Sequence, residues 1–420
     1  MKRMMTDVRD HDDLFDSVTG RGPRRSPGRR AKQGTLCVVV VVLFSTFLLG
    51  CDTGPAETLF DPDRPFRPDP VISAVEPSNS SLAGVGTITI MGENFSPNPE
   101  ENLVYFGNRR VTVVEASETQ LTVQPPPEPG ENLDLRVNVI GAEQFSNTTD
   151  YTLLAAVEEF GGVGDFEESS AIVTDEEGNV YVSMFASNAS AGIQRISPDG
   201  TREPYIDTPF RWDALQVGDD GTVYGVRNVR AIFRFAPGGG AQEVWAVAPN
   251  TADRFVAMAQ DEAFIWVAGF GGSIYRVDAG GVLENFSVEG DVRALVIHED
   301  FLYAATTQNG TSSVVRFPVD NGELGASETF FDVTEFAGPG VEALSLAATE
   351  EGALFVGTDG DDPLMLVEPD GSGDVFYPGL MDPPAFSLAW GEGSTLYMSR
   401  TDVVGMPSRI IKINTQREGS

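Results

Sequence analysis

The chain has 420 residues, of which 41% are hydrophobic, and it contains 45 Gly and 27 Pro. This composition is typical of a folded, turn-rich β protein and not of a disordered chain. Residues 1–50 carry nine Lys or Arg and five Asp or Glu, which leaves 19 of the 28 basic and 58 of the 63 acidic residues for the rest of the chain. So negative a chain repels phosphate groups, and nucleic acid is therefore excluded as a partner.

Residues 1–50 have the pattern of a signal peptide with a long basic first region. The apolar run 36–49 follows this region, and it is shorter than the roughly 20 residues that span a membrane. The run ends in Leu48-Leu49-Gly50-Cys51, which resembles the lipobox of bacterial lipoproteins. The resemblance implies cleavage before Cys51 and lipidation of its thiol. A plain signal peptide and an uncleaved anchor remain alternatives.

Residues 51–69 are rich in proline and lack hydrophobic periodicity, which predicts an extended tether behind the lipidated cysteine. We therefore expect a protein that contacts the lipid bilayer through Cys51, in a bacterial cell envelope, facing the periplasm or the exterior. The only other cysteine is Cys37 in the leader. The sequence thus predicts neither a disulfide framework nor a cysteine-based metal site.

Residues 70–154 predict a small seven-stranded β-sandwich, because short alternating runs are separated by Gly, Pro and Asn turns. The runs are VISAV, TITIMG, LVYFG, RVTVVEA, QLTVQPP, LDLRVNVI and DYTLL. The order of the pieces, from Pro70-Val71-Ile72 through TITIMGENF and VYFGNRRV to the prolines at 125–127, resembles the IPT/TIG family of immunoglobulin-like domains. The resemblance implies a binding or spacer module.

Residues 155–417 contain one pattern of about forty residues that occurs six times. The first apolar strands of the units begin at Ala171, Ala214, Val256, Ala294, Ala343 and Ser387, at steps of 43, 42, 38, 49 and 44 residues. A second strand of the type VYVS and a third of the type AIFRFA follow each of them. This period is that of a four-stranded propeller blade.

The fourth strand of each unit is an acidic and aromatic piece such as EVWA at Glu243, and the sixth unit lacks one. The missing piece, EEFG at Glu158, lies before the first unit, so we expect the segment 156–161 to complete the last blade and close the ring. The units resemble the NHL-repeat and SMP-30 (gluconolactonase-like) propellers. The expected fold is therefore all-β: an immunoglobulin-like sandwich and a six-bladed β-propeller behind a lipoprotein signal peptide.

Catalytic residues are scarce. The only histidine outside the leader is His298, predicted in a surface turn, so no Ser-His-Asp or Cys-His set is expected. Lactonases of the resembled family use a calcium-type ion held by acidic and amide side chains at the axis. The alternative to a binding protein is thus a metal-dependent lactonase or hydrolase using Glu168, Asp213, Glu342 or Asp359, although the matching second-strand positions are not acidic.

The leading hypothesis is a non-catalytic, monomeric binding protein without a cofactor, although carboxylate loops leave calcium open. Its partner would be an envelope protein, a glycan or a polar small molecule; a purely structural envelope scaffold is the third alternative. The residues expected to line the funnel of the ring and contact the ligand are Trp212, Asp213, Arg254, Arg293, Glu342, Asp359, Phe386 and Arg400. A basic residue recurs in the third strands (Arg195, Arg234, Arg276, Arg316 and Lys412), and for it we expect ion pairs between blades.

Overall fold

The structure is a computed structural model that describes residues 66–186, 189–401 and 406–420. The signal peptide, Cys51 and the tether up to residue 65 lie outside these ranges. The described chain is nearly all-β, with one short 3₁₀ turn (η1, Pro99–Glu101) and one short helix (α2, Val333–Ala337). No helix in the described ranges is long and apolar enough to cross a membrane.

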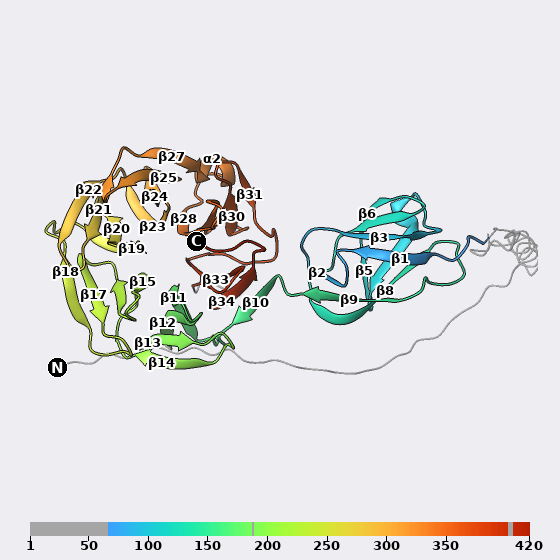
Figure 1. The fold of residues 1–420 in the computed structure, drawn as a ribbon, viewed down its shortest axis with the longest axis horizontal. Helices are drawn as coiled ribbons and strands as arrows, with labels where there is room; N and C mark the ends of the chain where they lie inside the picture. Colours follow the sequence, from blue (N-terminus) through green and yellow to red (C-terminus); the bar gives the residue numbers. More distant parts are fainter. Residues whose placement is uncertain (1–65, 187–188, 402–405) are drawn as a thin grey trace, which may run out of the picture. The chain divides into compact units, whose positions relative to one another are not determined.

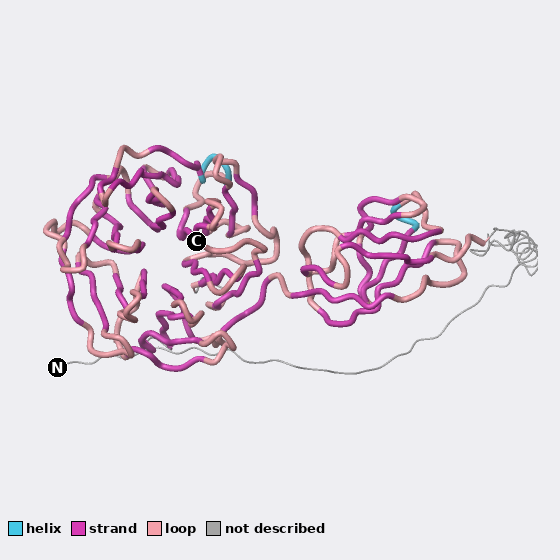
Figure 2. The backbone as a smooth tube through the Cα atoms, viewed as in Figure 1, coloured by secondary structure: helices cyan, strands magenta, loops and turns pink. Residues whose placement is uncertain are grey.

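The first part of the described chain is a sandwich of two sheets (Figures 1 and 2). One sheet has the order β1 (Val71–Glu76), β3 (Ile88–Glu93), β7 (Gln120–Val123), β6 (Val113–Ala116). The other has the order β2 (Ser80–Leu82), β9 (Thr149–Leu154), β8 (Gly130–Val139), β4 (Asn102–Phe106), β5 (Arg109–Val111). Alternate residues such as Ile88, Ile90, Val104 and Phe106 are fully buried, so the period-2 pattern of the sequence builds the core between the sheets.

The sandwich has nine strands in the described residues, where seven were predicted. The run RVTVVEA divides at Thr112 into β5 and β6, which belong to different sheets. Val111 and Val113 are both buried on either side of this division, because a strand that bends from one sheet to the other presents apolar side chains to the shared core at the corner. The additional strand β2 pairs in parallel with β9.

The rest of the described chain forms six sheets around a common centre (Figure 1). Each contains an inner strand followed outward by a second, third and fourth strand. The first three sheets are β11 (Glu167–Thr174), β12 (Val180–Ala186), β13 (Ala189–Ile196), β14 (Arg202–Ile206); β15 (Ala214–Val217), β16 (Val223–Val226), β17 (Ala231–Phe235), β18 (Glu243–Val247); and β19 (Arg254–Gln260), β20 (Ile265–Phe270), β21 (Ser273–Val277), β22 (Leu283–Ser287).

The next two sheets are β23 (Asp291–His298), β24 (Phe301–Gln308), β25 (Thr311–Asp320), β27 (Glu328–Asp332), with the two-residue β26 (Glu323–Leu324) also on β25; and β28 (Ala343–Ala348), β29 (Leu354–Thr358), β30 (Leu364–Val367), β31 (Gly373–Val375). The last contains β32 (Ser387–Trp390), β33 (Thr395–Arg400) and β34 (Arg409–Asn414), and its fourth strand is β10 (Val157–Phe160). The pairing of β10 with β34 joins the two ends of the ring, as expected from EEFG.

A ladder of ion pairs connects the third and fourth strands, the feature that we call the outer ladder. The register places Arg195 opposite Glu203, Arg234 opposite Glu243, Arg276 opposite Glu284, Arg316 opposite Glu328, and Lys412 opposite Glu158. Each of these pairs is an ion pair, with N–O distances such as 3.0 Å for Arg234–Glu243 and 3.1 Å for Lys412–Glu158. The prediction of pairs between blades is wrong for these five pairs, which form within sheets because residues directly opposite across strands are the nearest neighbours, and it holds for a second ion pair of Arg276. Arg276 additionally contacts Glu323 of the next sheet.

Many of the other carboxylates stabilise turns. The carboxylate of Asp175 accepts hydrogen bonds from the backbone N–H groups of Glu177 and Asn179, 3.0 and 2.9 Å long, and from the Tyr181 hydroxyl at 3.0 Å. Gly178 in the same turn has φ 77°, a conformation that glycine adopts without steric cost. Asp220 and Asp370 accept from backbone N–H groups two residues on in the same way. Much of the negative charge is thus explained by local structure.

Candidate functional site: the centre of the ring

The inner strands of the six sheets enclose a cavity of about 300 Å³ at the centre of the ring. Its lining comprises residues 172–174, 213–216, 256–260, 293–297, 344–348 and 386–390, together with Ser420. Because every sheet contributes its innermost strand, the cavity follows from the arrangement of the ring and not from one loop. Small and apolar residues such as Ala214, Leu215, Ala257 and Leu346 form most of its wall.

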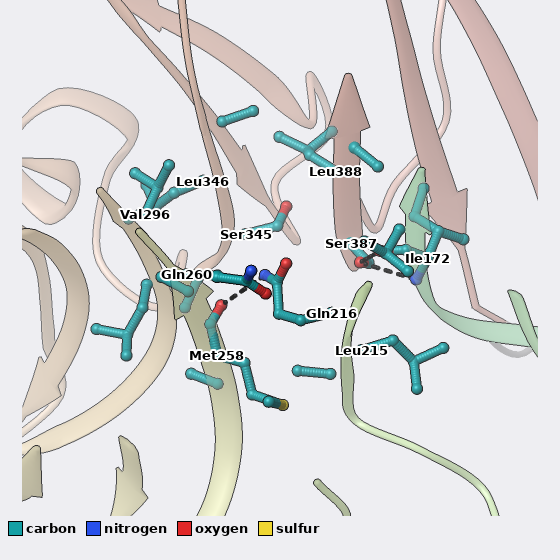
Figure 3. Close-up of a pocket in the computed structure, with 18 of the residues that line it drawn as sticks. Ile172, Leu215, Gln216, Met258, Gln260, Val296, Ser345, Leu346, Ser387 and Leu388 are labelled. Carbon is teal, nitrogen blue, oxygen red and sulfur yellow. Dashed lines mark hydrogen bonds between the residues drawn. The ribbon is translucent and has the colours of Figure 1, made fainter. Parts of the chain in front are cut away.

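Uncharged polar side chains also form part of this wall: Gln216, Gln260, Ser345 and Ser387 (Figure 3), together with Thr174 and Ser420. Ser387 accepts a hydrogen bond from the Ile172 N–H at 3.2 Å, and Ser345 donates to a carbonyl at 2.7 Å. The two amides lie close together in the view, and Gln216 donates to the Met258 carbonyl at 3.4 Å. The Oε1 atom of Gln260 is buried and has no hydrogen-bond partner in the described part of the chain. A buried acceptor without a partner costs free energy, so a donor from a ligand would stabilise it.

Three of the predicted funnel residues, Asp213, Arg293 and Phe386, lie at the start of inner strands and line the cavity. Arg293 is 3.1 Å from the carboxylate of Glu342, a fourth predicted residue, and its guanidinium lies 5.0 Å from the ring centroid of Phe270. Burial raises the pKa of Asp213, while the charge of Arg211 opposes the shift. The structure thus brings a carboxyl group, an ion pair and an aromatic ring to one end of the cavity.

Trp212 was expected to contact a ligand, but its side chain is fully buried. It packs against Phe233 and Phe235 at centroid distances of 5.4 Å, and a Cβ atom at Gly225 would lie 2.7 Å from its ring. The prediction was wrong because Trp212 lies two residues before the inner strand β15, and its ring fills the core between two neighbouring sheets while Asp213 beside it lines the cavity.

The other predicted residues do not line the cavity: Arg400 and Arg254 lie at strand ends, and Asp359 follows the strand β29. Arg400 is 8% exposed and its guanidinium is 2.7 Å from the carboxylate of Asp382. Asp359 is exposed and accepts a hydrogen bond from the Glu342 backbone N–H at 2.8 Å. Arg254 donates to the carbonyls of Thr251 and Asp253 at 2.9 and 2.7 Å. These residues organise the loops at the starts of the inner strands.

The carboxylates proposed for a metal-dependent lactonase do not come together. Glu342 pairs with Arg293, and Glu168 lies 3.9 Å from Arg211. Within the described ranges, no group of three or more His, Cys, Asp or Glu side chains is placed to hold a metal ion. The donor set that a shared calcium ion requires is therefore not assembled by these residues.

The opposite ends of the inner strands carry a different set of groups. His298 is the last residue of β23, and its Nδ1 atom lies 2.8 Å from the Ser420 hydroxyl. The Ser420 N–H donates to the Ala348 carbonyl at 3.0 Å, so the last residues of the chain lie against this end of the cavity, at the centre of the ring (Figure 1). His298 is only half-buried, and its hydrogen bond is to a serine that is itself tied to the wall by its backbone.

Sequence reasoning did not single out Gln216 and Gln260, the amides of the cavity wall. Both stand in apolar inner strands, in the runs ALQV and RFVAMAQ. A single amide within such a run is the signal that could have identified them, because a buried polar side chain needs a partner.

The chain was compared with known families, curated proteins and solved structures. Residues 70–153 match the model of the IPT/TIG domain family. No curated protein matches the chain. A Bacteroides thetaiotaomicron protein of unknown function is 15% identical, with a TM-score of 0.49, over 84% of this chain and 99% of the other. An auxiliary nutrient binding protein from the same species is 11% identical, with a TM-score of 0.49, over 84% and 98% of the two chains. A putative gluconolactonase is 17% identical, with a TM-score of 0.49, over 63% and 93%.

The fold and the matches define a nearly all-β protein with an IPT/TIG domain followed by a propeller-like ring of sheets.

Proposed function

We propose that the chain is a lipid-anchored envelope protein whose ring is a six-bladed β-propeller that binds a polar ligand without catalysis. The observation that carries the proposal is the central cavity with its unpartnered amide. A cavity lined mainly by apolar residue types with a few convergent polar groups is the usual form of a small-molecule site, and here the surface exposed to the cavity is more polar than apolar. Its volume of about 300 Å³ suits a small molecule or one side chain of a protein partner.

The chemistry of the lining supports binding over catalysis. Amides and hydroxyls donate and accept hydrogen bonds but do not transfer protons near neutral pH. Among the residues lining the cavity, Asp213 and Arg293 are the charged ones, and Arg293 pairs with Glu342. His298 lies beside the hydroxyl of Ser420 at the far end of this lining, but in the described chain no hydrogen bond joins its ring to the third, orienting group of a catalytic triad.

The proposal includes the organisation expected from the sequence. Residues 1–50 would be the signal peptide, 51–69 the lipidated cysteine and tether, 70–154 the sandwich and 155–417 the propeller closed by the segment 156–161. Each of the six sheets would be one blade. The sandwich would act as a spacer between the bilayer and the ligand site.

The ligand site can be tested with the full-length protein in detergent. Neutral mono- and disaccharides and free amino acids serve as probes, and a rise in the melting temperature reports binding to the native state. We expect at least one probe to raise it, and Gln260→Leu to abolish that rise while Gln120→Leu, an exposed glutamine of the sandwich, retains it. A rise that Gln260→Leu retains would contradict the site. No rise with any probe would favour a structural scaffold.

Catalysis is tested separately by incubating the same protein with small lactones and calcium. We expect no acid release above that of the buffer. Release that depends on calcium and is lost in Glu342→Gln would overturn the non-catalytic proposal.

The anchor is tested by expression in a bacterial host fed with an alkyne-bearing fatty acid. We expect label and detergent-phase partitioning in the natural chain and the loss of both in Cys51→Ser. Equal partitioning of Cys51→Ser and the natural chain would instead favour an uncleaved anchor.

A further inference from the structure

One outer face of the sandwich carries aromatic, aliphatic and arginine side chains together. It belongs to the sheet of β5, β4 and β8, in which alternate residues such as Val104 and Val137 are buried in the core. The residues between them point outward, because successive side chains of a strand alternate between the two faces. We call the outward surface the β4–β8 face, and it comprises Leu103, Tyr105, Arg110, Arg136, Asn138 and Ile140, with Phe145 of the loop that follows β8.

Tyr105 lies in the middle of this face, with an arginine on each side. The register places it opposite Arg110 of β5 and opposite Arg136 of β8, and side chains that are directly opposite have Cβ atoms about 5 Å apart. The guanidinium of Arg136 lies 4.9 Å from the ring centroid of Phe145 and 5.9 Å from that of Tyr105. The two rings meet edge to face at 5.9 Å. The arginine is thus held against two aromatic rings near the surface.

The β4–β8 face is also distinguished by its charge. Residues 66–154 contain four arginines, no lysine and 12 Asp or Glu. Two of the arginines, Arg67 and Arg109, lie within 4 Å of a glutamate carboxylate. The other two, Arg110 and Arg136, have no carboxylate at this distance in the described chain, and both belong to the β4–β8 face. The unpaired cations of an acidic domain are therefore collected on one face.

The chain enters the sandwich beside the most exposed end of this face. Ile140 is 40% exposed and Phe145 is 45% exposed. Phe66, the first described residue, is 71% exposed, and the backbone N–H of Arg67 after it donates to the Gly141 carbonyl at 2.9 Å. Three large apolar side chains are therefore open to solvent in one region, next to the segment that comes from the tether.

This region is close in sequence to the proposed lipid anchor. Residues 52–65 connect Cys51 to Phe66, and a fully extended chain of this length spans at most about 50 Å. A bilayer that holds Cys51 is therefore within reach of the sandwich. Tethering also raises the effective concentration of the domain at the membrane, so that contacts too weak to act alone become populated.

We infer that the β4–β8 face docks on the surface of a phospholipid bilayer, an inference that rests on the lipid anchor proposed above. Aromatic rings are favoured at the boundary between hydrocarbon and headgroups, and Tyr105 and Phe145 supply them here. The guanidinium groups of Arg110 and Arg136 pair with headgroup phosphates. Because the rest of the sandwich is acidic, a zwitterionic bilayer suits this face better than an anionic one.

A protein is the competing occupant of this face, because aromatic and arginine side chains are also enriched in protein interfaces. Asp134 and Asp150, which are exposed and opposite each other at the far end of the same sheet, would favour a protein partner if they were covered as well. A reporter on the face distinguishes the two occupants, because lipid and protein shield it from water in different ways.

The experiment places a thiol-reactive fluorophore on the face. Once the leader is removed, Cys51 is the only cysteine, so Ile140→Cys introduces a single free thiol into the lipidated chain. The matched control is Val114→Cys, at a residue of β6 in the other sheet that is 51% exposed. Each full-length protein is reconstituted into phosphatidylcholine vesicles that contain brominated lipid, which quenches a fluorophore in contact with the bilayer, and iodide is then added to quench fluorophores open to water.

We expect brominated lipid to quench the fluorophore at position 140 and to leave the fluorophore at position 114 unquenched, with the reverse order for iodide. Arg110→Gln in the Ile140→Cys chain should lower the docked fraction relative to the undocked one by about two- to fivefold, as the loss of an exposed ion pair implies. Arg109→Gln should leave it unchanged, because Arg109 pairs with Glu128.

Equal quenching by brominated lipid at the two positions, or none at position 140, would overturn the docking. Protection of position 140 from iodide without quenching by brominated lipid would assign the face to a protein contact, such as a second copy of this chain. Fatty-acid labelling of Cys51 reports the anchor independently. Labelled protein without quenching at position 140 overturns the docking alone, whereas unlabelled protein that does not associate with vesicles overturns the anchor as well.

Discussion

The outer ladder and the three arginines Arg227, Arg230 and Arg254 use the same residue type in opposite ways. In the ladder, a cation recurs at one position of the third strands and faces a glutamate across the sheet. The three other arginines occupy no repeated position: in the described chain Arg227 contacts aromatic rings, and Arg230 and Arg254 donate to backbone carbonyls. This difference indicates that the residues that recur in every repeat stabilise the pairing of strands within each sheet. The residues that depart from the repeat are the candidates for binding.

The inner and outer halves of the ring differ in the same way. The second strands contribute buried apolar residues such as Val182, Val267 and Val356, and the inner strands beside them are also mainly apolar, with an occasional amide. The fourth strands are largely exposed and acidic. The interior therefore supplies stability through burial, while the outer charges contribute little, because exposed ion pairs are weakened by solvent and salt.

The largest expected effect comes from the interior. Trp212→Ala removes a fully buried ring from the cluster with Phe233 and Phe235, and we expect it to lower the free energy of unfolding of the ring by about 3–5 kcal/mol. Urea unfolding followed by tryptophan fluorescence and circular dichroism measures the change. Phe386→Ala, at a half-buried residue of the cavity, is the matched control and should cost less. A stability unchanged in Trp212→Ala would restore this residue as a ligand contact.

This residue also shows where sequence reasoning succeeded and where it did not. The period of the repeat located the four strands of each sheet and the closing strand β10, because strand alternation and turn residues are local properties. Whether Trp212 points to the cavity or between sheets depends on the twist of a neighbouring sheet, which no local pattern specifies. The partner strand of the outer ladder and the stacking of Arg227 on Phe210 depend likewise on register and on contacts between units.

The next largest effect is expected from a hydrogen bond that connects a third strand to the residue preceding an inner strand. The Tyr275 hydroxyl of the third strand β21 donates to the buried carboxylate of Asp253, next to the inner strand, at 2.5 Å. Tyr275→Phe leaves that carboxylate with one partner fewer, and we expect a loss of about 1–3 kcal/mol. Thermal unfolding at pH 7 provides the measurement. A loss as small as that of Tyr105→Phe, at a half-buried tyrosine of the sandwich, would show that the link contributes nothing.

The hydrogen bond between Tyr275 and Asp253 also predicts that the stability of the ring depends on pH. Burial, with a further contribution from the hydrogen bond to Asp253, raises the pKa of Tyr275 to about 12, from 10.0 when unfolded. The folded state therefore favours the neutral phenol, so its contribution is complete below pH 10 and is lost as the pH rises from 10 to 12. We expect the melting temperature to fall in this window less steeply in Tyr275→Phe than in the natural protein. Parallel curves for the two would contradict the assignment.

The outer ladder should contribute less. Arg234→Ala removes an ion pair with Glu243 in which both side chains are substantially exposed, and we expect a loss below about 1 kcal/mol that shrinks as salt is added. Glu243→Ala and the double variant complete a cycle that isolates the pair. A coupling energy above about 2 kcal/mol would show that the outer half stabilises the ring as strongly as single buried residues do.

The smallest expected effect concerns the third strand in which a leucine replaces the recurring cation of the outer ladder. Leu366 of β30 occupies the position of the recurring cation and faces Asp374 across the sheet. Leu366→Arg would complete the ladder with one more cross-strand pair, which is worth about 0.2–1 kcal/mol. The substitution also removes apolar contact, because Leu366 packs against the cluster of Phe355 and Leu364, although the aliphatic stem of arginine replaces part of it.

We therefore expect the free energy of unfolding of Leu366→Arg to differ from that of the natural protein by no more than about 0.5 kcal/mol, and to be higher at low salt than at high salt. Leu366→Gln has a similar stem without the charge, so the salt dependence should be absent from it. If the two variants respond equally to salt, the recurring cation is retained for packing and not for its charge.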